Sequence, residues 1–249
     1  MPDVMFSANT GYLWSERPFL ERIRQARRQG FHAVEFHDEA QSTDRAALRD
    51  VLAETGLPVV GLNVRMGGTF GCAAVAGARD QARRDIDEAI ELAADIGAGA
   101  VHVLAGLTSD PQALSCYRDN LRHALAQSDL TILIEPICPQ QVPGYALGTV
   151  GQAAAILAEI EHPRLKILFD CYHVHHVTGD VARTFEAHAA EIGHVQISAA
   201  ENRAEPWPGA LNYAELVPGF IARGYTGVFG CEYRPETDTD AGLGWRDQF

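Results

Sequence analysis

Short apolar runs alternate with longer amphipathic segments from one end of the chain to the other. The apolar runs do not switch strictly between polar and apolar residues, which is typical of parallel strands that helices cover. They predict strands over residues 4–8, 33–36, 58–63, 100–104, 131–135, 166–170, 193–197 and 228–232. The segments between them predict helices over residues 17–29, 43–55, 78–97, 111–127, 149–161, 180–191 and 212–223.

The helix expected over 78–97 illustrates the pattern. Ile86, Ile90 and Ala93 recur at helical spacing, and Gly97 follows as a C-terminal glycine. Strands separated by such helices favour an α/β fold, a closed (β/α)8 TIM barrel, which typically takes about 250 residues. We therefore expect residues 1–249 to form a single barrel domain. An open doubly wound sheet is the alternative, but it favours a glycine-rich turn after the first strand, where this chain reads S-A-N-T-G.

Charge and cysteine content narrow the class of protein. The net charge is -13, and such a surface repels phosphate backbones, so we expect no nucleic-acid partner. No apolar run reaches the roughly 20 residues that span a bilayer, and the N-terminus lacks the pattern of a signal peptide. The five cysteines contain no C-x-x-C pair, which argues against a disulfide framework or a zinc–thiolate site. We expect a cytoplasmic protein without a membrane partner, and a homo-oligomer remains open.

The lysine content excludes one class of mechanism. Lys166 is the single lysine of the chain, and it lies at the start of a predicted strand, away from the strand ends that carry chemistry in barrels. Schiff-base catalysis requires a lysine in the pocket. A lysine-dependent aldolase or a pyridoxal enzyme is therefore not expected.

Oxygen-donor side chains end the last four predicted strands, at the end of the barrel where active sites lie. They are Glu135, Asp170, Gln196 and Glu232, each separated by one β/α unit, so all four can point at a common centre. Any one of them alone could equally be a charge that reaches solvent. Three carboxylates that close repel one another unless a cation lies between them. Because an all-oxygen ligand set favours Mg²⁺ or Mn²⁺ over zinc, we predict one such divalent cation here.

The same arrangement suggests a reaction. A divalent cation can bind the neighbouring carbonyl and hydroxyl oxygens of an α-hydroxy carbonyl compound and stabilise an enediolate. Glu135 and Glu232 lie on opposite sides of the predicted metal site, so one can remove a proton and the other can return it. Return to the next carbon is isomerisation, whereas return to the same carbon from the opposite face is epimerisation. The residues alone do not separate these outcomes.

Further polar residues are expected to line the mouth of the barrel. His173 could donate to a substrate oxygen or cap a loop backbone. Arg203 could bind a substrate carboxylate or pair with a neighbouring surface glutamate. His102 is a third candidate for substrate contact, and Glu35 lies beside it at the mouth; a structural role is favoured for both.

Several segments together resemble the hydroxypyruvate isomerases, a family within the xylose-isomerase-like TIM barrel superfamily. They are L-I-E-P-I-C-P-Q-Q-V-P-G-Y at 133–145, F-D-C-Y-H at 169–173, G-H-V-Q-I at 193–197, G-C-E-Y-R-P at 230–235 and A-G-L-G-W at 241–245. The resemblance covers nearly the whole chain. It implies an aldose–ketose type isomerase of carbohydrate metabolism that interconverts hydroxypyruvate and 2-hydroxy-3-oxopropanoate (tartronate semialdehyde). It also implies metal binding by Glu135, Asp170, Gln196 and Glu232, with the two glutamates as the acid/base pair. In related sugar epimerases, the positions matched by His173 and Arg203 hold the substrate.

Three positions depart from the usual pattern of that family. Cys138 stands where asparagine is usual, and Ala199 and Ala210 stand where acidic residues are usual. The departures leave the predicted metal ligands intact but put the substrate in question. A 2-oxo-tetronate isomerase and a ketose 3-epimerase with the same metal site are therefore kept as alternatives.

Two other classes agree less well with the residues. A hydrolase of the apurinic-endonuclease kind uses several histidine ligands and a basic face for DNA, whereas this chain has Gln196 in its ligand set and a net charge of -13. A non-catalytic barrel would be expected to have lost one of the two glutamates, and both are present.

Overall fold

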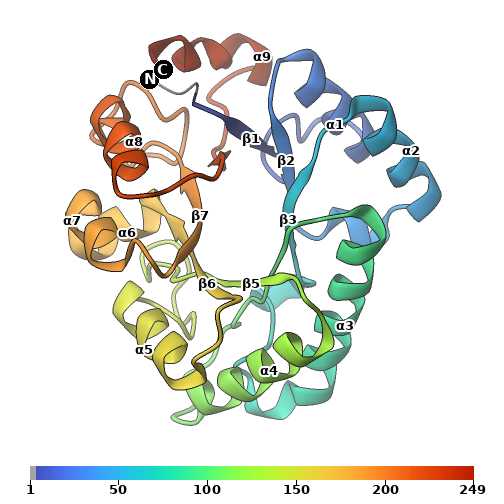
Figure 1. Cartoon of the computed structure of the whole chain (residues 1–249), viewed down its shortest axis with the longest axis vertical. Coiled ribbons are helices and arrows are strands. Elements are labelled where there is room, and N and C mark those ends of the chain that lie inside the picture. Colours follow the sequence, from blue (N-terminus) through green and yellow to red (C-terminus); the bar gives the residue numbers. More distant parts are fainter. Residues whose placement is uncertain (1–3) are drawn as a thin grey trace.

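The computed structural model describes residues 4–249, and the parallel strands within this range close into a barrel in chain order (Figure 1). Neighbouring strands are parallel throughout, including the pair of first and last strands that closes the ring. The strands are β1 (Phe6–Asn9), β2 (Ala33–Phe36), β3 (Val59–Asn63), β4 (Ala100–His102), β5 (Thr131–Ile134), β6 (Leu165–Asp170), β7 (Ile192–Ile197) and β8 (Phe229–Cys231). The prediction of a (β/α)8 barrel is confirmed.

Helices form an outer ring around these strands, as Figure 1 shows. They are α1 (Phe19–Arg28), α2 (Arg45–Thr55), α3 (Arg79–Ile96), α4 (Ala113–Gln127), α5 (Val150–Ile160), α6 (Cys171–Thr178), α7 (Val181–His188), α8 (Tyr213–Ala222) and the short α9 (Thr239–Gly242). All the predicted helices are present with small shifts at their ends. No helix was predicted between the strand ending at Asp170 and residue 180, whereas α6 begins directly at Cys171.

Local sequence signals set several helix ends. Thr149 and Gln152 form a reciprocal capping box at the start of α5. Gly97 ends α3 with φ of 70°, a left-handed conformation that glycine adopts without steric cost. The carboxylate of Asp170 accepts a hydrogen bond from the backbone N–H of Tyr172 and so caps α6. This cap turns the chain from β6 into a helix at the point where Asp170 enters the barrel mouth.

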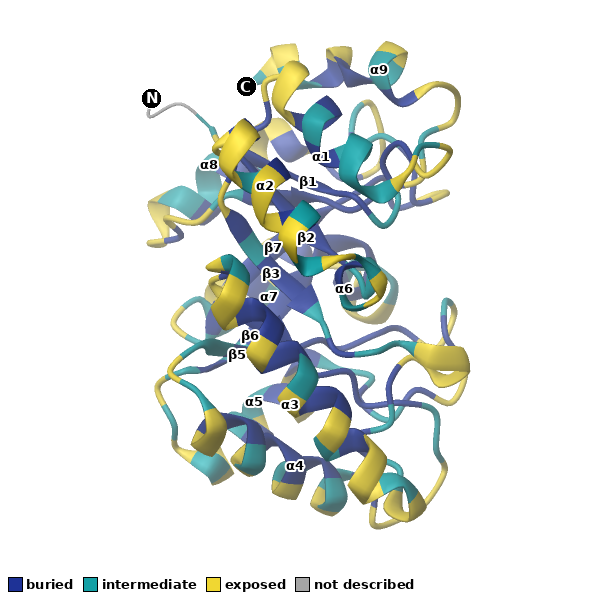
Figure 2. Cartoon of the chain, turned by 90° about the vertical axis from the view of Figure 1, so that its right-hand side faces the viewer, coloured by how far each residue is buried: buried dark blue, intermediate teal, exposed yellow. Residues whose placement is uncertain are grey.

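The core lies in two layers. The helices bury their apolar faces against the outside of the barrel, while exposed residues gather on their outer faces, as Figure 2 shows. Inside the barrel, Ala100, Leu133 and Leu168 form a separate small apolar cluster. The interior also holds buried polar side chains, including Glu35 and His194, whose polar atoms face each other at 2.7 Å. Buried polar groups require such hydrogen-bond partners.

The tail after β8 packs against the barrel beside the start of β1. Trp245 is buried, and its ring contacts Phe6 edge-on with centroids 5.1 Å apart. Asp240 in α9 accepts hydrogen bonds from Trp14 and Gln25, which fastens the tail to α1 and the loop before it. Within residues 4–249, no helix combines the length and apolar character needed to cross a membrane.

Candidate active site

Three buried carboxylates meet where the strands of the barrel end. Glu135 directly follows β5, Asp170 ends β6 and Glu232 directly follows β8. Their exposed fractions are 6%, 2% and 8%, so all three are removed from bulk water. Glu135 and Glu232 line the same cavity. The structure therefore brings the two proposed acid/base groups to one small space, as their strand positions predicted.

A buried arginine lies among these carboxylates. The Nη2 of Arg203 donates to Asp170 Oδ2 at 2.8 Å and also to Glu232 Oε2. Arg203 adopts φ of 58°, a left-handed conformation that is uncommon outside glycine and that orients its side chain from the loop after β7. The side chain is 5% exposed, so the expected alternative of a surface pair with a nearby glutamate is wrong. Its positive charge partly offsets the three carboxylates.

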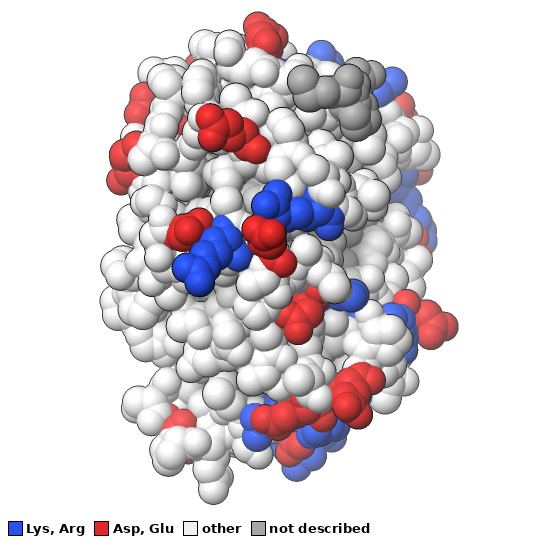
Figure 3. Space-filling model, turned by 60° about the vertical axis from the view of Figure 1, so that its left-hand side comes forward, with Lys and Arg blue, Asp and Glu red and all other residues white. Residues whose placement is uncertain are grey.

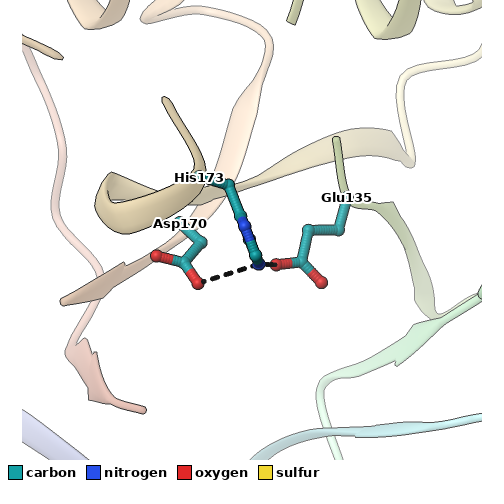
Figure 4. Close-up of side chains that lie close together, drawn as sticks. All are labelled: Glu135, Asp170 and His173. Atoms are coloured by element: carbon teal, nitrogen blue, oxygen red, sulfur yellow. Dashed lines mark ion pairs between the residues drawn. The ribbon is translucent and has the colours of Figure 1, made fainter. Parts of the chain in front are cut away.

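His173 lies between Glu135 and Asp170 in the first turn of α6 (Figure 4). Its Nε2 is 3.5 Å from Glu135 Oε1 and 3.6 Å from Asp170 Oδ2. The same Nε2 accepts a hydrogen bond of 2.9 Å from Arg203 Nη1. Cys138 Sγ lies 3.2 Å from the other ring nitrogen, Nδ1. The unusual cysteine thus contacts a residue of the site, which makes it a position that can alter substrate preference.

The pKa values of the three carboxyl groups are displaced in different directions: burial raises those of Glu135 and Asp170, whereas neighbouring charges lower that of Glu232. Burial, together with the charges of Glu232 and Asp170, raises the pKa of Glu135 well above its usual range. Burial also raises the pKa of Asp170 to about 7, although Arg203 opposes this. For Glu232, burial alone would raise the pKa, but the charges of Arg203 and His37 outweigh it and lower the pKa to about 2. The pair across the cavity is therefore strongly asymmetric in its affinity for protons.

The donor set suits a hard divalent cation. The Oε1 atoms of Glu135 and Gln196 are buried without a hydrogen-bond partner, which is costly in a folded protein unless a ligand is bound there. Glu135, Asp170 and His173 each place a potential ligand atom within 4.8 Å of the others. Carboxylate and amide oxygens are the ligands that Mg²⁺ and Mn²⁺ prefer. A cation at this point would also relieve the repulsion that raises the pKa of Glu135.

Gln196 lies one strand away from Asp170, and the two residues are paired in register between β6 and β7. Its Nε2 donates to Glu35 Oε1 at 2.8 Å. Glu35 was expected at the mouth, but the structure places it deeper, inside the barrel, where it lines a small internal cavity with Gln196 and His194. The reason is the register of β2, which aims the Glu35 carboxylate across the barrel towards β7.

The third expected substrate contact, His102, also lies low in the barrel. Its Nδ1 is 3.0 Å from Asn63 Oδ1, and its Nε2 is 3.8 Å from Glu135 Oε2. Burial lowers the pKa of His102 to about 3, so the ring is neutral at physiological pH. His102 lines the internal cavity and not the one that holds Glu232.

Sequence reasoning missed several residues of the site. His37 Nε2 lies 3.0 Å from Glu232 Oε1, and Asn9 Nδ2 donates to the same oxygen at 3.1 Å. Both residues stand at or directly after the end of a strand, so a reading extended by one position would have found them. Tyr12 faces Arg203, with the guanidinium 5.7 Å from its ring centre, but it lies in a loop whose path the sequence does not reveal.

The cavity beside the carboxylates is small, with a volume of about 50 Å³. Its lining contains both apolar and polar residues. The apolar lining residues are Met66, Phe70, Leu104, Ile137 and Val142, and the remaining ones are Tyr12, His37, Asn63, Glu135, Gln141, His173, Arg203 and Glu232. Neither Ala199 nor Ala210 is among these described lining residues. The size suits a molecule of a few carbon atoms.

A larger hollow of about 340 Å³ lies on the outer wall, between α7 and α8. It is lined by residues such as Asp180, Asn212, Glu215 and Arg223, and is remote from the strand ends. The smaller cavity at the strand ends instead holds buried carboxyl groups with displaced pKa values, and such groups cluster at functional sites. We therefore place the active site in the smaller cavity.

Comparison with known proteins now identifies the family. A sequence model described as xylose isomerase-like TIM barrel matches residues 23–249. The chain belongs to this family. It is 40% identical to the 2-oxo-tetronate isomerase of Cupriavidus necator, with 96% of each chain covered. It is 34% identical to the hydroxypyruvate isomerase of Escherichia coli, with 99% of each chain covered.

A solved structure of the same family agrees closely with this fold. The protein from Brucella melitensis described as an AP endonuclease of family 2 superposes with a TM-score of 0.94 at 32% identity, covering 99% of both chains. The expectations of a xylose isomerase-like barrel, of a likeness to hydroxypyruvate isomerases and of an isomerase are thus confirmed.

Proposed function

We propose that this chain is a metal-dependent isomerase of short hydroxy-oxo acids, with hydroxypyruvate and 2-oxo-tetronates as the candidate substrates. One observation carries the proposal: Glu135 and Glu232 flank a single small cavity, next to buried oxygens that lack partners. The names of the two relatives agree with this chemistry. We further propose that residues 1–249 act as one catalytic domain.

The cation would be held by Glu135, Asp170, Gln196 and Glu232, and Mg²⁺ or Mn²⁺ is proposed on the chemistry of these oxygens. When bound, it supplies positive charge that stabilises the enediolate form of the substrate. Arg203 and His173 line the same cavity and are proposed to hold substrate oxygens. A guanidinium suits a carboxylate because it donates two parallel hydrogen bonds.

The proposed proton transfers balance within the substrate. In hydroxypyruvate, one glutamate takes a proton from C3, and the electron pair of that C–H bond forms the C2–C3 double bond of the enediolate. The other glutamate donates a proton to C2, while the hydroxyl proton passes from O3 to O2. The product is 2-hydroxy-3-oxopropanoate, with no external oxidant or reductant. General acid/base catalysis by a positioned pair typically contributes about 10²–10⁴ to the rate for each group.

The substrate is proposed to be an acid and not a polynucleotide. Figure 3 shows one face of the molecule, on which acidic and basic side chains lie in small mixed groups between wide uncharged areas. The net charge of -13 acts against binding of a phosphate backbone. The 40% identity to a 2-oxo-tetronate isomerase is the specific observation that favours a four-carbon acid as the second candidate.

Proton exchange with solvent separates the candidates. The protein is incubated in D₂O with Mg²⁺ and, in turn, with hydroxypyruvate, a 2-oxo-tetronate and a free ketose, and deuterium is located by NMR. Label at C3 of the 2-oxo acid and at C2 of its 2-hydroxy-3-oxo isomer is the expected result. That isomer is an aldehyde for hydroxypyruvate and a 3-oxo acid for the 2-oxo-tetronate. Label at C3 of the ketose alone, with inversion there, would replace the proposal by a 3-epimerase.

A further inference from the structure

Glu35 is surrounded by hydrogen-bond donors inside the barrel. Its Oε1 accepts from Gln196 Nε2 at 2.8 Å and from Asn9 Nδ2 at 3.2 Å. Its Oε2 accepts from the hydroxyl of Ser7 at 3.0 Å and lies 2.7 Å from His194 Nε2. Glu35 is 4% exposed, so these contacts replace water almost completely. The carboxylate is therefore held in one orientation by four neighbours from two strands, β1 and β7, and cannot rotate without breaking buried hydrogen bonds.

This arrangement determines the orientation of the Gln196 side-chain amide. Because Nε2 donates to Glu35, a flipped amide would place two oxygens against each other at hydrogen-bond distance. Oε1 must therefore point away from Glu35, and it is buried without a hydrogen-bond partner. Only the oxygen of an amide binds Mg²⁺ or Mn²⁺, since the NH₂ group carries no available lone pair.

We propose that Glu35 is a positioning residue that orients the Gln196 amide so that its oxygen is presented to the divalent cation. This inference rests on the proposed function, since it assumes a cation at the strand ends. The partner that orients a metal ligand typically affects metal affinity about 10- to 100-fold.

The backbone of β8 leaves room for this contact. A Cβ atom added at Gly230 would lie 2.7 Å from both carboxylate oxygens of Glu35 and 2.8 Å from His194 Nε2. Gly230 is paired in register with Gln196. The close approach of the Glu35 carboxylate to β7 and β8 thus depends on a glycine at this position, and it was not apparent from the sequence.

One competing arrangement is a single water that bonds Gln196 Oε1. The internal cavity lined by Gln196, Glu35 and His194 has a volume of about 20 Å³, which is enough for one water molecule. In that case Gln196 would contribute to the interior of the barrel and not to the cation. Metal affinity distinguishes the two arrangements, because a water partner does not involve the cation.

Calorimetric titration of the folded, metal-free protein with Mn²⁺ tests the proposal without reference to turnover. Glu35→Leu removes all four acceptor contacts at similar volume, and we expect its Kd for Mn²⁺ to rise about 10- to 100-fold. Glu35→Gln keeps one oxygen for Gln196 and should stay within about threefold of the unaltered protein. Asp85→Asn is the matched control, since Asp85 is a buried carboxylate in α3 that hydrogen-bonds Gln81, away from the strand ends, and its variant should bind Mn²⁺ normally.

A double-mutant cycle shows whether Glu35 acts through Gln196. Gln196→Ala alone should weaken Mn²⁺ binding, and adding Glu35→Leu to it should change the Kd little further. The proposal is overturned if Glu35→Leu leaves the Kd unchanged, or if it weakens binding equally in both backgrounds. An unchanged Kd in Gln196→Ala would favour the water arrangement and also overturn it.

If Glu35→Leu does not fold, a second test exchanges the glutamate and the glutamine between positions 35 and 196. Gln196→Glu places two carboxylates against each other, whereas Glu35→Gln with Gln196→Glu restores one donor and one acceptor. The exchanged protein should bind Mn²⁺ at least about 10-fold more tightly than Gln196→Glu alone; equal affinities would contradict the proposal. If the unaltered protein binds no Mn²⁺, the proposed metal site itself fails, whereas tight binding that Glu35 variants do not alter removes only the role of Glu35.

Discussion

Glu35 and Glu135 are both buried glutamates of the barrel, but their surroundings lower the pKa of Glu35 and raise the pKa of Glu135. Glu35 lines the internal cavity, which we call the lower layer, and is surrounded by four hydrogen-bond partners. Glu135 lines the cavity at the strand ends, which we call the upper layer, and has one oxygen unpartnered. Burial alone would raise the pKa of Glu35, but His194 and the hydrogen bonds outweigh it and lower the pKa. The pKa of Glu135 is raised well above its usual range by burial and by its acidic neighbours.

The contrast in hydrogen bonding between Glu35 and Glu135 distinguishes two roles that a buried carboxylate can have. A carboxylate whose oxygens are all hydrogen-bonded stabilises the arrangement of the groups around it. A carboxylate left with an unpartnered oxygen costs free energy, and that cost is recovered when a cation or substrate binds. The lower layer therefore holds side chains in place, and the upper layer is the one proposed to bind ligands.

Removal of the cation should have the largest effect on the upper layer. If the unpartnered oxygens exist to bind Mg²⁺ or Mn²⁺, chelation should abolish isomerisation of hydroxypyruvate and of 2-oxo-tetronates. Added Mg²⁺ or Mn²⁺ should restore it, as measured by NMR of the 2-hydroxy-3-oxo products. Circular dichroism before and after chelation controls for loss of fold. Full turnover in excess chelator would remove the cation from the proposal.

Substitution of either proposed acid/base residue should have the next largest effect on turnover. Glu135→Gln and Glu232→Gln keep the size of the side chain but remove its ability to transfer a proton, so each should lower kcat by about 10²–10⁴. Glu215→Gln is the matched control, because Glu215 is an exposed glutamate that lines the outer hollow on α8. A normal kcat in either cavity variant would exclude that residue from proton transfer, and loss of activity in the control would redirect attention to the outer hollow.

Substitution of Arg203 tests whether the cavity at the strand ends binds the carboxylate group of the substrate. Arg203→Ala should raise KM for oxo acids about 10- to 100-fold, the value of a charge-assisted hydrogen bond, and should raise KM for a neutral ketose much less. Steady-state kinetics on both substrates give the ratio. Because Arg203 also lowers the pKa of Glu232, the variant should shift the pH dependence of kcat as well. An equal rise in KM for both substrates would show that Arg203 supports the site without binding the acid group.

The pH dependence of metal binding should show the smallest effect, and it reports directly on the protonation of the carboxylates in the upper layer. The pKa of Asp170 is raised to about 7, above its unfolded value, so the metal-free fold binds an extra proton and loses stability as pH rises from about 4 to about 7. Cation binding requires the deprotonated carboxylate, so the increase in Tm caused by Mg²⁺ should be greater at pH 8 than at pH 5.5. Thermal melts with and without Mg²⁺ across this range measure it. An increment that is constant or that falls with pH would contradict the assigned ligands.

Strand ends were read well from the sequence because the apolar pattern of a covered parallel strand is local. Glu135, Asp170, Gln196 and Glu232 follow from that pattern together with the rule that barrels carry chemistry at the carboxyl ends of strands. The role of Asp170 as the cap of α6 was missed, because the histidine-rich segment after it lacks a clear helical pattern. The depth of Glu35 was also misjudged, since strand position alone does not say how far a side chain reaches across the barrel.

The sequence by itself determined the order of strands and helices, the closed barrel and the position of four oxygen donors at or next to the ends of strands. Only the tertiary structure decided which charges face each other: Arg203 on Asp170 and Glu232, and Glu35 on Gln196. The physical reason is distance along the chain. Periodicity is set by neighbouring residues, whereas these contacts join residues 29 to 161 positions apart and depend on how strands from across the ring are brought into register.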